Sequence, residues 1–166
     1  MSKDKATKEY KLLFVCLGNI CRSPAANAVM QKMVNDAHLS DRFFIDSAGV
    51  GGWHIGDLPD RRMREHGLRR GYRVDHIARQ FYADKDFTEF DYIIVMDDDN
   101  YNDISTQANN QEERNKIHRL TDFAHNYPND NIVPDPYYGG AAGFEYALDL
   151  IEDGCKGLLA TLGFQP

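Results

Sequence analysis

Apolar residues gather in a few short runs along the chain, and these runs predict the strands of a sheet. The segments 10–15 and 92–96 are almost continuously apolar, as in strands covered by helices on both faces. The segment 43–49 predicts another strand that leads into a glycine-rich loop, and 117–120 predicts a weaker fourth. No run approaches the ~20 apolar residues of a membrane helix, so we expect no membrane segment.

Helical patterns lie between and after these strands. We expect a helix over 23–38 with one apolar face, and a second over 59–70 that is rich in arginine. A short helix begins near residue 98, and a final helix runs from 140 or 143 to 161. The segment 71–91 shows no regular pattern.

Strand and helix signals alternate without repeats or linkers, so the sequence predicts an α/β fold. We expect one domain over 10–166, a three-layer sandwich with a four-stranded parallel sheet flanked by helices on both faces, after a flexible tail at 1–9. Ligands of such sheets bind at the carboxyl ends of the strands. Cys16, Ser47, Asp97 and the loop after Leu120 all follow predicted strands.

A compact loop joins the first predicted strand to the first helix. Ser23 is suited to cap this helix and Pro24 to be its first residue, because proline lacks the N–H that has no partner there. The backbone N–H groups of residues 17–22 could then surround an anion at the positive end of the helix. The same dipoles favour a thiolate at Cys16, and Arg22 can clamp two phosphate oxygens. The pattern predicts a phosphate-monoester site.

The predicted cradle is formed by Leu17, Gly18, Asn19, Ile20, Cys21 and Arg22. The simpler alternative for Cys16 is a small buried residue at a strand end, which Arg22 and the helix-start signature make the weaker interpretation. The loop lacks the motifs of nucleotide and dinucleotide sites. Cys16 and Cys21 also lack the spacing and partners of a zinc site, so we expect no metal and no cofactor.

The charge balance limits the classes of partner. The net charge of −7, from 19 basic and 26 acidic residues, argues against nucleic-acid binding, which needs a basic surface. Three cysteines are too few for a disulfide scaffold, and the polar N-terminus has no apolar signal core. We expect a cytoplasmic protein, with export that needs no signal peptide left open, and a monomer with at most weak self-association.

A proton donor is expected on the loop that follows the fourth strand. Asp135 lies between Pro134 and Pro136, which stiffen the loop, although an isolated Asp-Pro is more often an ordinary turn. Such a carboxyl group could protonate the departing oxygen of an ester. An aromatic rim for a flat phenyl ring could come from Trp53, Tyr137 and Tyr138.

Together these motifs resemble the low-molecular-weight protein tyrosine phosphatase family. The resemblance covers most of the chain and is carried by residues 16–24, 46–49, 52–54, 59–62, 66–67, 76–80, 96–97 and 135–139. It implies a small parallel sheet with helices on both faces. It also implies metal-free hydrolysis of phosphotyrosine proteins through a cysteinyl-phosphate, with Asp135 as general acid and then base.

The resemblance further implies a network that supports the loop, formed by Asn19, Ser23, Ser47, His76 and Asp97. We expect Asn19 in a left-handed turn, which asparagine tolerates well. Ile20 lies at the rim. The isoleucine at this position resembles the tyrosine-directed members of the family, whereas the position looks like threonine in related enzymes that act on phosphoarginine. Cys21 is predicted to capture oxidised Cys16 in a reversible disulfide.

Three other functions are also compatible with the sequence. A phosphoarginine phosphatase or an arsenate reductase could use the same scaffold, although the reductase needs further cysteines near the loop and only Cys155 remains. An inactive phosphate-binding module is the third. It would need neither a nucleophile nor a proton donor, so the combination of Cys16, Arg22 and Asp135 favours an enzyme.

Overall fold

The apolar run near the start of the chain forms an inner strand, β1 (Tyr10–Cys16), in the computed structural model, which describes residues 8–137 and 139–165. The other strands are β2 (Phe43–Gly49), β3 (Tyr92–Val95) and β4 (Ile117–Arg119). They pair in the order β2-β1-β3-β4, and every pairing is parallel. The predicted α/β class and the four-stranded parallel sheet are therefore confirmed.

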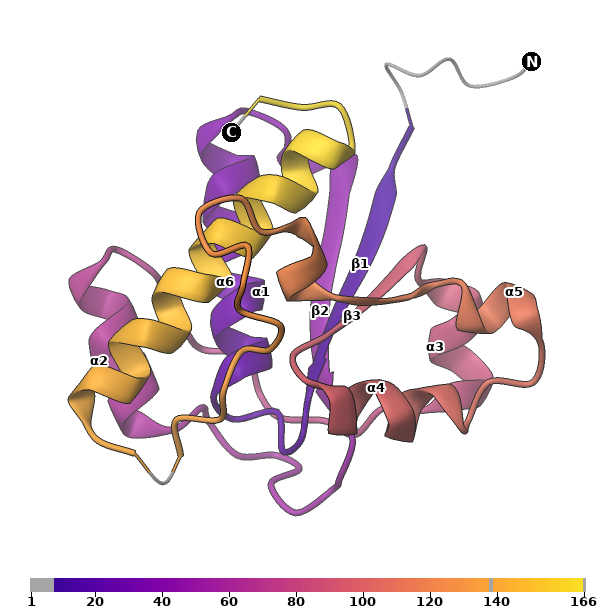
Figure 1. Ribbon diagram of the computed structural model, residues 1–166, viewed down its shortest axis with the longest axis horizontal. Coiled ribbons are helices and arrows are strands. Elements are labelled where there is room, and N and C mark those ends of the chain that lie inside the picture. Colours follow the sequence, from indigo (N-terminus) through magenta and orange to yellow (C-terminus); the bar gives the residue numbers. More distant parts are fainter. Residues whose placement is uncertain (1–7, 138, 166) are drawn as a thin grey trace.

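Helices cover both faces of this sheet (Figure 1). One side carries α1 (Arg22–Asp36), α2 (Arg61–Arg69) and α6 (Ala141–Thr161), and the other carries α3 (Ala83–Glu89), α4 (Asp98–Ser105) and α5 (Gln111–Arg114). Side chains of β1 alternate between two cores. Leu12 and Phe14 pack with the residues of α1 and α6, whereas Leu13 and Val15 pack with those of α3 and α4. This alternation explains why β1 is apolar throughout.

The first helix differs from the prediction at both ends. It begins at Arg22, with Cys21 at the N-cap and no side chain capping it, and it ends at Asp36. The capping role predicted for Ser23 is wrong, because loop residues engage its hydroxyl group instead. Pro24 is the third helical residue rather than the first, which costs no hydrogen bond because first-turn N–H groups lack helical partners.

The segment 71–91, where no regular element was predicted, contains α3. Its seven residues, four of them charged, are too few and too polar to show a helical period. Two 3-10 turns, η2 (Ser40–Arg42) and η3 (Leu120–Phe123), were not predicted either. Short elements of this kind depend on the packing of the rest of the chain.

Gly157 lets η3 pack directly on α6. A Cβ at this position would lie 1.7 Å from the carbonyl oxygen of Phe123. Gly157 is fully inside the helix and lowers its intrinsic propensity, yet only glycine leaves room for the neighbouring backbone. The chain that follows η3 therefore starts beside the C-terminal half of α6 and returns to the first residue of that helix, Ala141.

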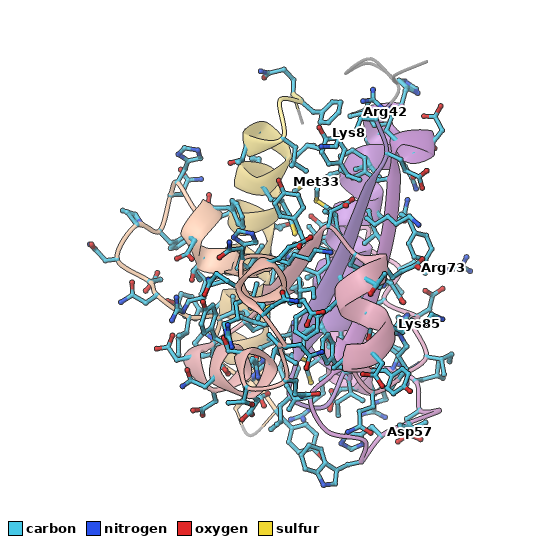
Figure 2. All side chains as sticks on the ribbon, turned by 90° about the vertical axis from the view of Figure 1, so that its right-hand side faces the viewer. Lys8, Met33, Arg42, Asp57, Arg73 and Lys85 are labelled. Atoms are coloured by element: carbon cyan, nitrogen blue, oxygen red, sulfur yellow. The ribbon has the colours of Figure 1, made fainter. Side chains whose placement is uncertain are left out.

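The loops of the candidate site leave the carboxyl edge of the sheet together. The β1–β2 register pairs Cys16 with Gly49, and the N–H groups of Val50 and Gly51 donate to the carbonyl groups of Cys16 and Leu17, each at 2.9 Å. Figure 2 shows the loop with Asp57 at this edge and Lys8 and Arg42 at the opposite one.

Of the predicted tail, residues 1–7 lie outside the described residues. Within the described ranges, no helix combines the length and the apolar character needed to span a membrane.

Candidate active site

The loop from Cys16 to Arg22 is held in a tight curve by its neighbours. Asn19 has φ 59°, so the left-handed conformation expected for it is confirmed. The glycine-rich loop after β2 lies directly against this curve, because a Cβ at Gly49 would be only 2.9 Å from the carbonyl carbon of Gly18. Glycine at position 49 therefore permits the two loops to touch.

A buried hydrogen-bond cluster fixes the loop behind Cys16. Asn19 donates from Nδ2 to the hydroxyl groups of Ser23 at 2.7 Å and Ser47 at 3.0 Å. Its Oδ1 accepts from the N–H of Arg79 at 2.9 Å. The Ser23 hydroxyl lies 3.0 Å from Cys16 Sγ, and since it accepts from Asn19, its own hydrogen can point to the sulfur.

The two remaining members of the expected support network make no hydrogen bond to the side chains of Asn19, Ser23 or Ser47 among the described residues. His76 contacts the backbone of Ser47, and its Nδ1 lies 3.6 Å from Asp46 Oδ1. Its Nε2 is buried and has no hydrogen-bond partner among the described residues. Asp97 binds Arg22 instead. Three of the five expected residues thus form one cluster, while His76 adjoins it and Asp97 supports the opposite side of the loop.

The guanidinium group of Arg22 is buried and faces two carboxylates. It donates from Nη1 to Asp97 at 2.6 Å and to the carbonyl oxygen of Val133 at 3.0 Å, and its Nη2 lies 3.6 Å from Asp135. Burial alone would lower the pKa of Arg22, but the charge of Cys16 and the hydrogen bond and charge of Asp97 raise it above the usual value. Arg22 is therefore a permanent cation beside Cys16.

The second cysteine of the loop is held as a thiol. Burial, together with the negative charges of Asp60 and Cys16, raises the pKa of Cys21 well above its usual value. Cys16, Cys21 and Cys155 are all buried and free. Cys155, whose pKa burial also raises, lies in α6 far from this loop in the sequence.

A pocket of about 320 Å³ opens above the loop. It is lined by Cys16, Leu17, Gly18, Ile20, Cys21, Arg22, Trp53, His54, Asp135 and Tyr137. Cys16 is 3% exposed and lies in the depth of the site, whereas Trp53 is 71% exposed at its edge. Tyr138, which the sequence places at the same rim, lies outside the described residues. The pocket brings together the sulfur of Cys16, the buried cation of Arg22 and the carboxyl group of Asp135. A nucleophile, a positive charge and a carboxyl group are the groups needed to cleave a phosphate ester.

Comparison with known proteins agrees with this chemistry. The family model described as low molecular weight phosphotyrosine protein phosphatase matches residues 11–165. The chain belongs to this family. The family resemblance predicted from the sequence is confirmed, and the predicted enzyme class, protein-tyrosine phosphatase, is that of the family.

Relatives of this phosphatase chain match it over nearly its full length. A Synechocystis sp. protein, named among the low molecular weight protein-tyrosine-phosphatases, is 51% identical over 92% of this chain and 96% of its own. A protein tyrosine phosphatase structure from Entamoeba histolytica has a TM-score of 0.89 and 46% identity, covering 93% of this chain and 97% of its own. DARP, a Drosophila arginine phosphatase, has a TM-score of 0.85 and 33% identity, covering 94% of this chain and 99% of its own.

Three residues of the phosphatase site were not singled out from the sequence. His54 lines the pocket, Arg79 binds Asn19 through its backbone and Asp46 and Asp86 through its side chain, and Arg62 contacts the loop that carries Asp135. All three lie in segments that carried the family resemblance, 52–54, 59–62 and 76–80. Without that resemblance, the side chains of Arg62 and Arg79 would look like ordinary surface charges.

Proposed function

We propose that this protein is a tyrosine phosphatase that hydrolyses aryl phosphate monoesters through a cysteinyl-phosphate. The observation that carries the proposal is the pocket in which Cys16, the buried Arg22 and Asp135 meet. Cys16 is the nucleophile, Arg22 the phosphate clamp and Asp135 the general acid and base. No metal ion or cofactor takes part in either step.

In the first step the thiolate of Cys16 attacks phosphorus in line with the leaving phenol. The S–P bond forms as the bond from phosphorus to the phenolic oxygen breaks, and Asp135 gives its proton to that oxygen. The backbone N–H groups of residues 17–22 and the guanidinium group of Arg22 stabilise the charge on the three equatorial oxygens.

In the second step water takes the place of the phenol. Asp135, now a carboxylate, accepts a proton from the water, whose oxygen attacks phosphorus as the S–P bond breaks. Inorganic phosphate leaves, Cys16 returns to the thiolate and Asp135 is again protonated. The Ser23 hydroxyl group, 3.0 Å from the sulfur, can donate to the thiolate whenever the phosphate is absent.

The proposed substrates are phosphotyrosine-containing proteins. Cys16 is buried beneath a rim that includes Trp53 and Tyr137, and a long flat side chain reaches such a depth better than phosphoserine. The names of the curated relatives support this class. A phosphoarginine substrate is the alternative, supported by the Drosophila relative and opposed by isoleucine at position 20.

Hydrolysis of phosphotyrosine and phosphoarginine peptides in the presence of a chelator tests the proposal. We expect turnover of the phosphotyrosine peptide, almost complete loss of turnover in Cys16→Ser and Arg22→Ala, and a smaller loss in Asp135→Ala. Undiminished turnover by Cys16→Ser would overturn the mechanism. Faster turnover of the phosphoarginine peptide would overturn the substrate class while leaving the nucleophile in place.

The proposal includes oxidation control through Cys21. Oxidation of Cys16 by peroxide gives a sulfenic acid, and attack by the Cys21 sulfur forms the disulfide and releases water. Because the pKa of Cys21 is raised, we expect this capture to be slow at neutral pH. Peroxide inactivation of the wild type should be reversed by dithiothreitol, and inactivation of Cys21→Ser should be reversed far less.

A further inference from the structure

The first turn of α2 connects the two loops that form the site. The N–H of Asp60 donates to the carbonyl oxygen of Ile20 at 2.7 Å, which ties this turn to the phosphate loop. The Asp60 carboxylate caps α2 by accepting from the N–H of Arg62 at 2.9 Å. The same carboxylate binds the guanidinium group of Arg62, from Nε at 3.2 Å and from Nη2 at 3.1 Å.

From this position Arg62 reaches the loop that carries Asp135. Its Nη2 donates to the carbonyl oxygen of Tyr137 at 2.8 Å, and its Nη1 lies 3.5 Å from that of Gly139. The guanidinium carbon also lies over the rings of Phe144 at 4.8 Å and Tyr137 at 5.5 Å from their centroids. Such contacts orient a planar cation and cover part of its surface.

The backbone of Tyr137 connects Arg62 to Asp135, the proposed general acid. The N–H of Tyr137 donates to Asp135 Oδ1 at 3.0 Å, while its carbonyl oxygen accepts from Arg62. Asp135 is about a third exposed and lies 3.6 Å from Arg22, and within residues 8–137 and 139–165 the N–H of Tyr137 is the group that donates a hydrogen bond to its carboxylate. A shift of Tyr137 would therefore shift the proton donor relative to Cys16.

We propose that Arg62, held by Asp60, is the positioning residue that sets the Asp135 carboxyl group over the leaving oxygen. This inference rests on the proposed role of Asp135 as general acid. Arg62 is not among the described residues that line the pocket, and it acts through the backbone of Tyr137. A displaced acid slows the departure of a poor leaving group most, because a good leaving group departs without a full proton.

The test measures kcat/KM over a series of aryl phosphates whose phenols differ in acidity. For Arg62→Ala we expect a loss of about tenfold with phenyl phosphate and less than about threefold with a nitrophenyl phosphate, part of the 10²–10⁴ that a positioned acid supplies. Arg62→Lys keeps the charge but cannot present a planar fork to Asp60 and Tyr137 together, so the same dependence should appear. If Arg62→Ala does not fold, the Arg62→Lys variant alone tests the inference.

Arg61 provides a matched control. It is the neighbouring residue, its side chain is 79% exposed, and it pairs with Glu65 on its own helix at 3.5 Å. Arg61→Ala should leave the whole series unchanged. An equal loss for every leaving group in both Arg62 variants would overturn the inference, because a merely structural role predicts that result.

Asp135→Asn separates this inference from the proposed function. This variant should itself steepen the dependence on the leaving group, and adding Arg62→Ala to it should steepen it no further. If Asp135→Asn leaves the dependence unchanged, the role of Asp135 fails and the inference fails with it. If Asp135→Asn steepens the dependence and the Arg62 variants do not, only the role of Arg62 is wrong.

Discussion

Asp97 uses its two carboxylate oxygens for two different partners, the buried cation Arg22 and the start of α4. Oδ2 accepts from Arg22 at 2.6 Å, and Oδ1 accepts from the N–H of Asn100 at 2.8 Å. Arg22 is 2% exposed, so this partner offsets much of the cost of burying its charge. The phosphate clamp is thus aimed by a residue that also begins a helix.

Replacing Asp97 by asparagine separates these two functions. Asparagine is also a good N-cap, so α4 should persist, but an amide NH₂ facing Arg22 would set donor against donor. We expect Asp97→Asn to lower kcat/KM for an aryl phosphate on the order of tenfold, because a clamp that is no longer fixed stabilises the transition state less. Steady-state kinetics would measure this loss. Asp98→Asn is the control, since Asp98 is 63% exposed and pairs with Arg119; an equal loss there would contradict the account.

Asn19 combines an unfavourable backbone conformation with three side-chain hydrogen bonds, two of them buried and one partly buried. Asn19→Gly should relieve the left-handed backbone but leave the Ser23 and Ser47 hydroxyl groups and the Arg79 N–H without this partner. Asn19→Ala should lose the same bonds and add the cost of a Cβ at φ 59°. We therefore expect Asn19→Ala to be the less stable variant by about 1 kcal/mol. Urea unfolding of both variants checks this, and equal stabilities would show that the backbone carries no strain.

The sequence was sufficient for the local features of the site and insufficient for the long-range ones. The left-handed turn at Asn19 and the closeness of the two loops follow from residue types and from parallel pairing. The hydroxyl group of Ser23 was assigned to the helix because serine usually caps, whereas the loop uses it to support Asn19 and Cys16. Arg62 and Arg79 could not be assigned from local pattern, since their partners Tyr137 and Asp46 lie 75 and 33 residues away.

The rim residue Trp53 should affect aryl substrates without affecting phosphate itself. Its ring lies over Gly51, where a Cβ would be 1.8 Å from a ring carbon, and the side chain is 71% exposed. We expect Trp53→Ala to raise KM for a phosphotyrosine peptide by roughly three- to tenfold, the scale of one aromatic contact. The inhibition constant of inorganic phosphate should not change. A parallel rise in both constants would mean that Trp53 shapes the phosphate loop rather than the rim.

Acid should weaken the contact between Asp60 and Arg62. Burial would raise the pKa of Asp60, but hydrogen bonds from the Arg62 side chain and backbone outweigh it and hold the pKa below the usual value. A lowered folded-state pKa adds stability above the unfolded value of about 3.9, and this stability is lost as the pH falls through the folded value. We expect the free energy of unfolding to fall below about pH 4 and to fall less steeply in Asp60→Asn. Urea titrations between neutral and acid pH would show it, and identical slopes would refute the contribution.

Two glycines of α6 should respond oppositely to alanine. At Gly157 an added Cβ would lie 1.7 Å from the carbonyl oxygen of Phe123, so η3 must move away from the helix. We expect Gly157→Ala to destabilise the fold by about 3 kcal/mol or more. The two closest atoms, the carbonyl oxygen and carbon of Phe123, belong to the backbone and cannot rotate aside as a side chain could. At Gly143, in the first turn, the nearest atom is Pro136 Cβ at 3.9 Å, which is ordinary contact. Gly143→Ala should therefore stabilise by about 0.5–1 kcal/mol through helix propensity and a less flexible unfolded chain. Urea unfolding of both variants decides the matter, and a mild effect at Gly157 would mean that η3 is not held against α6.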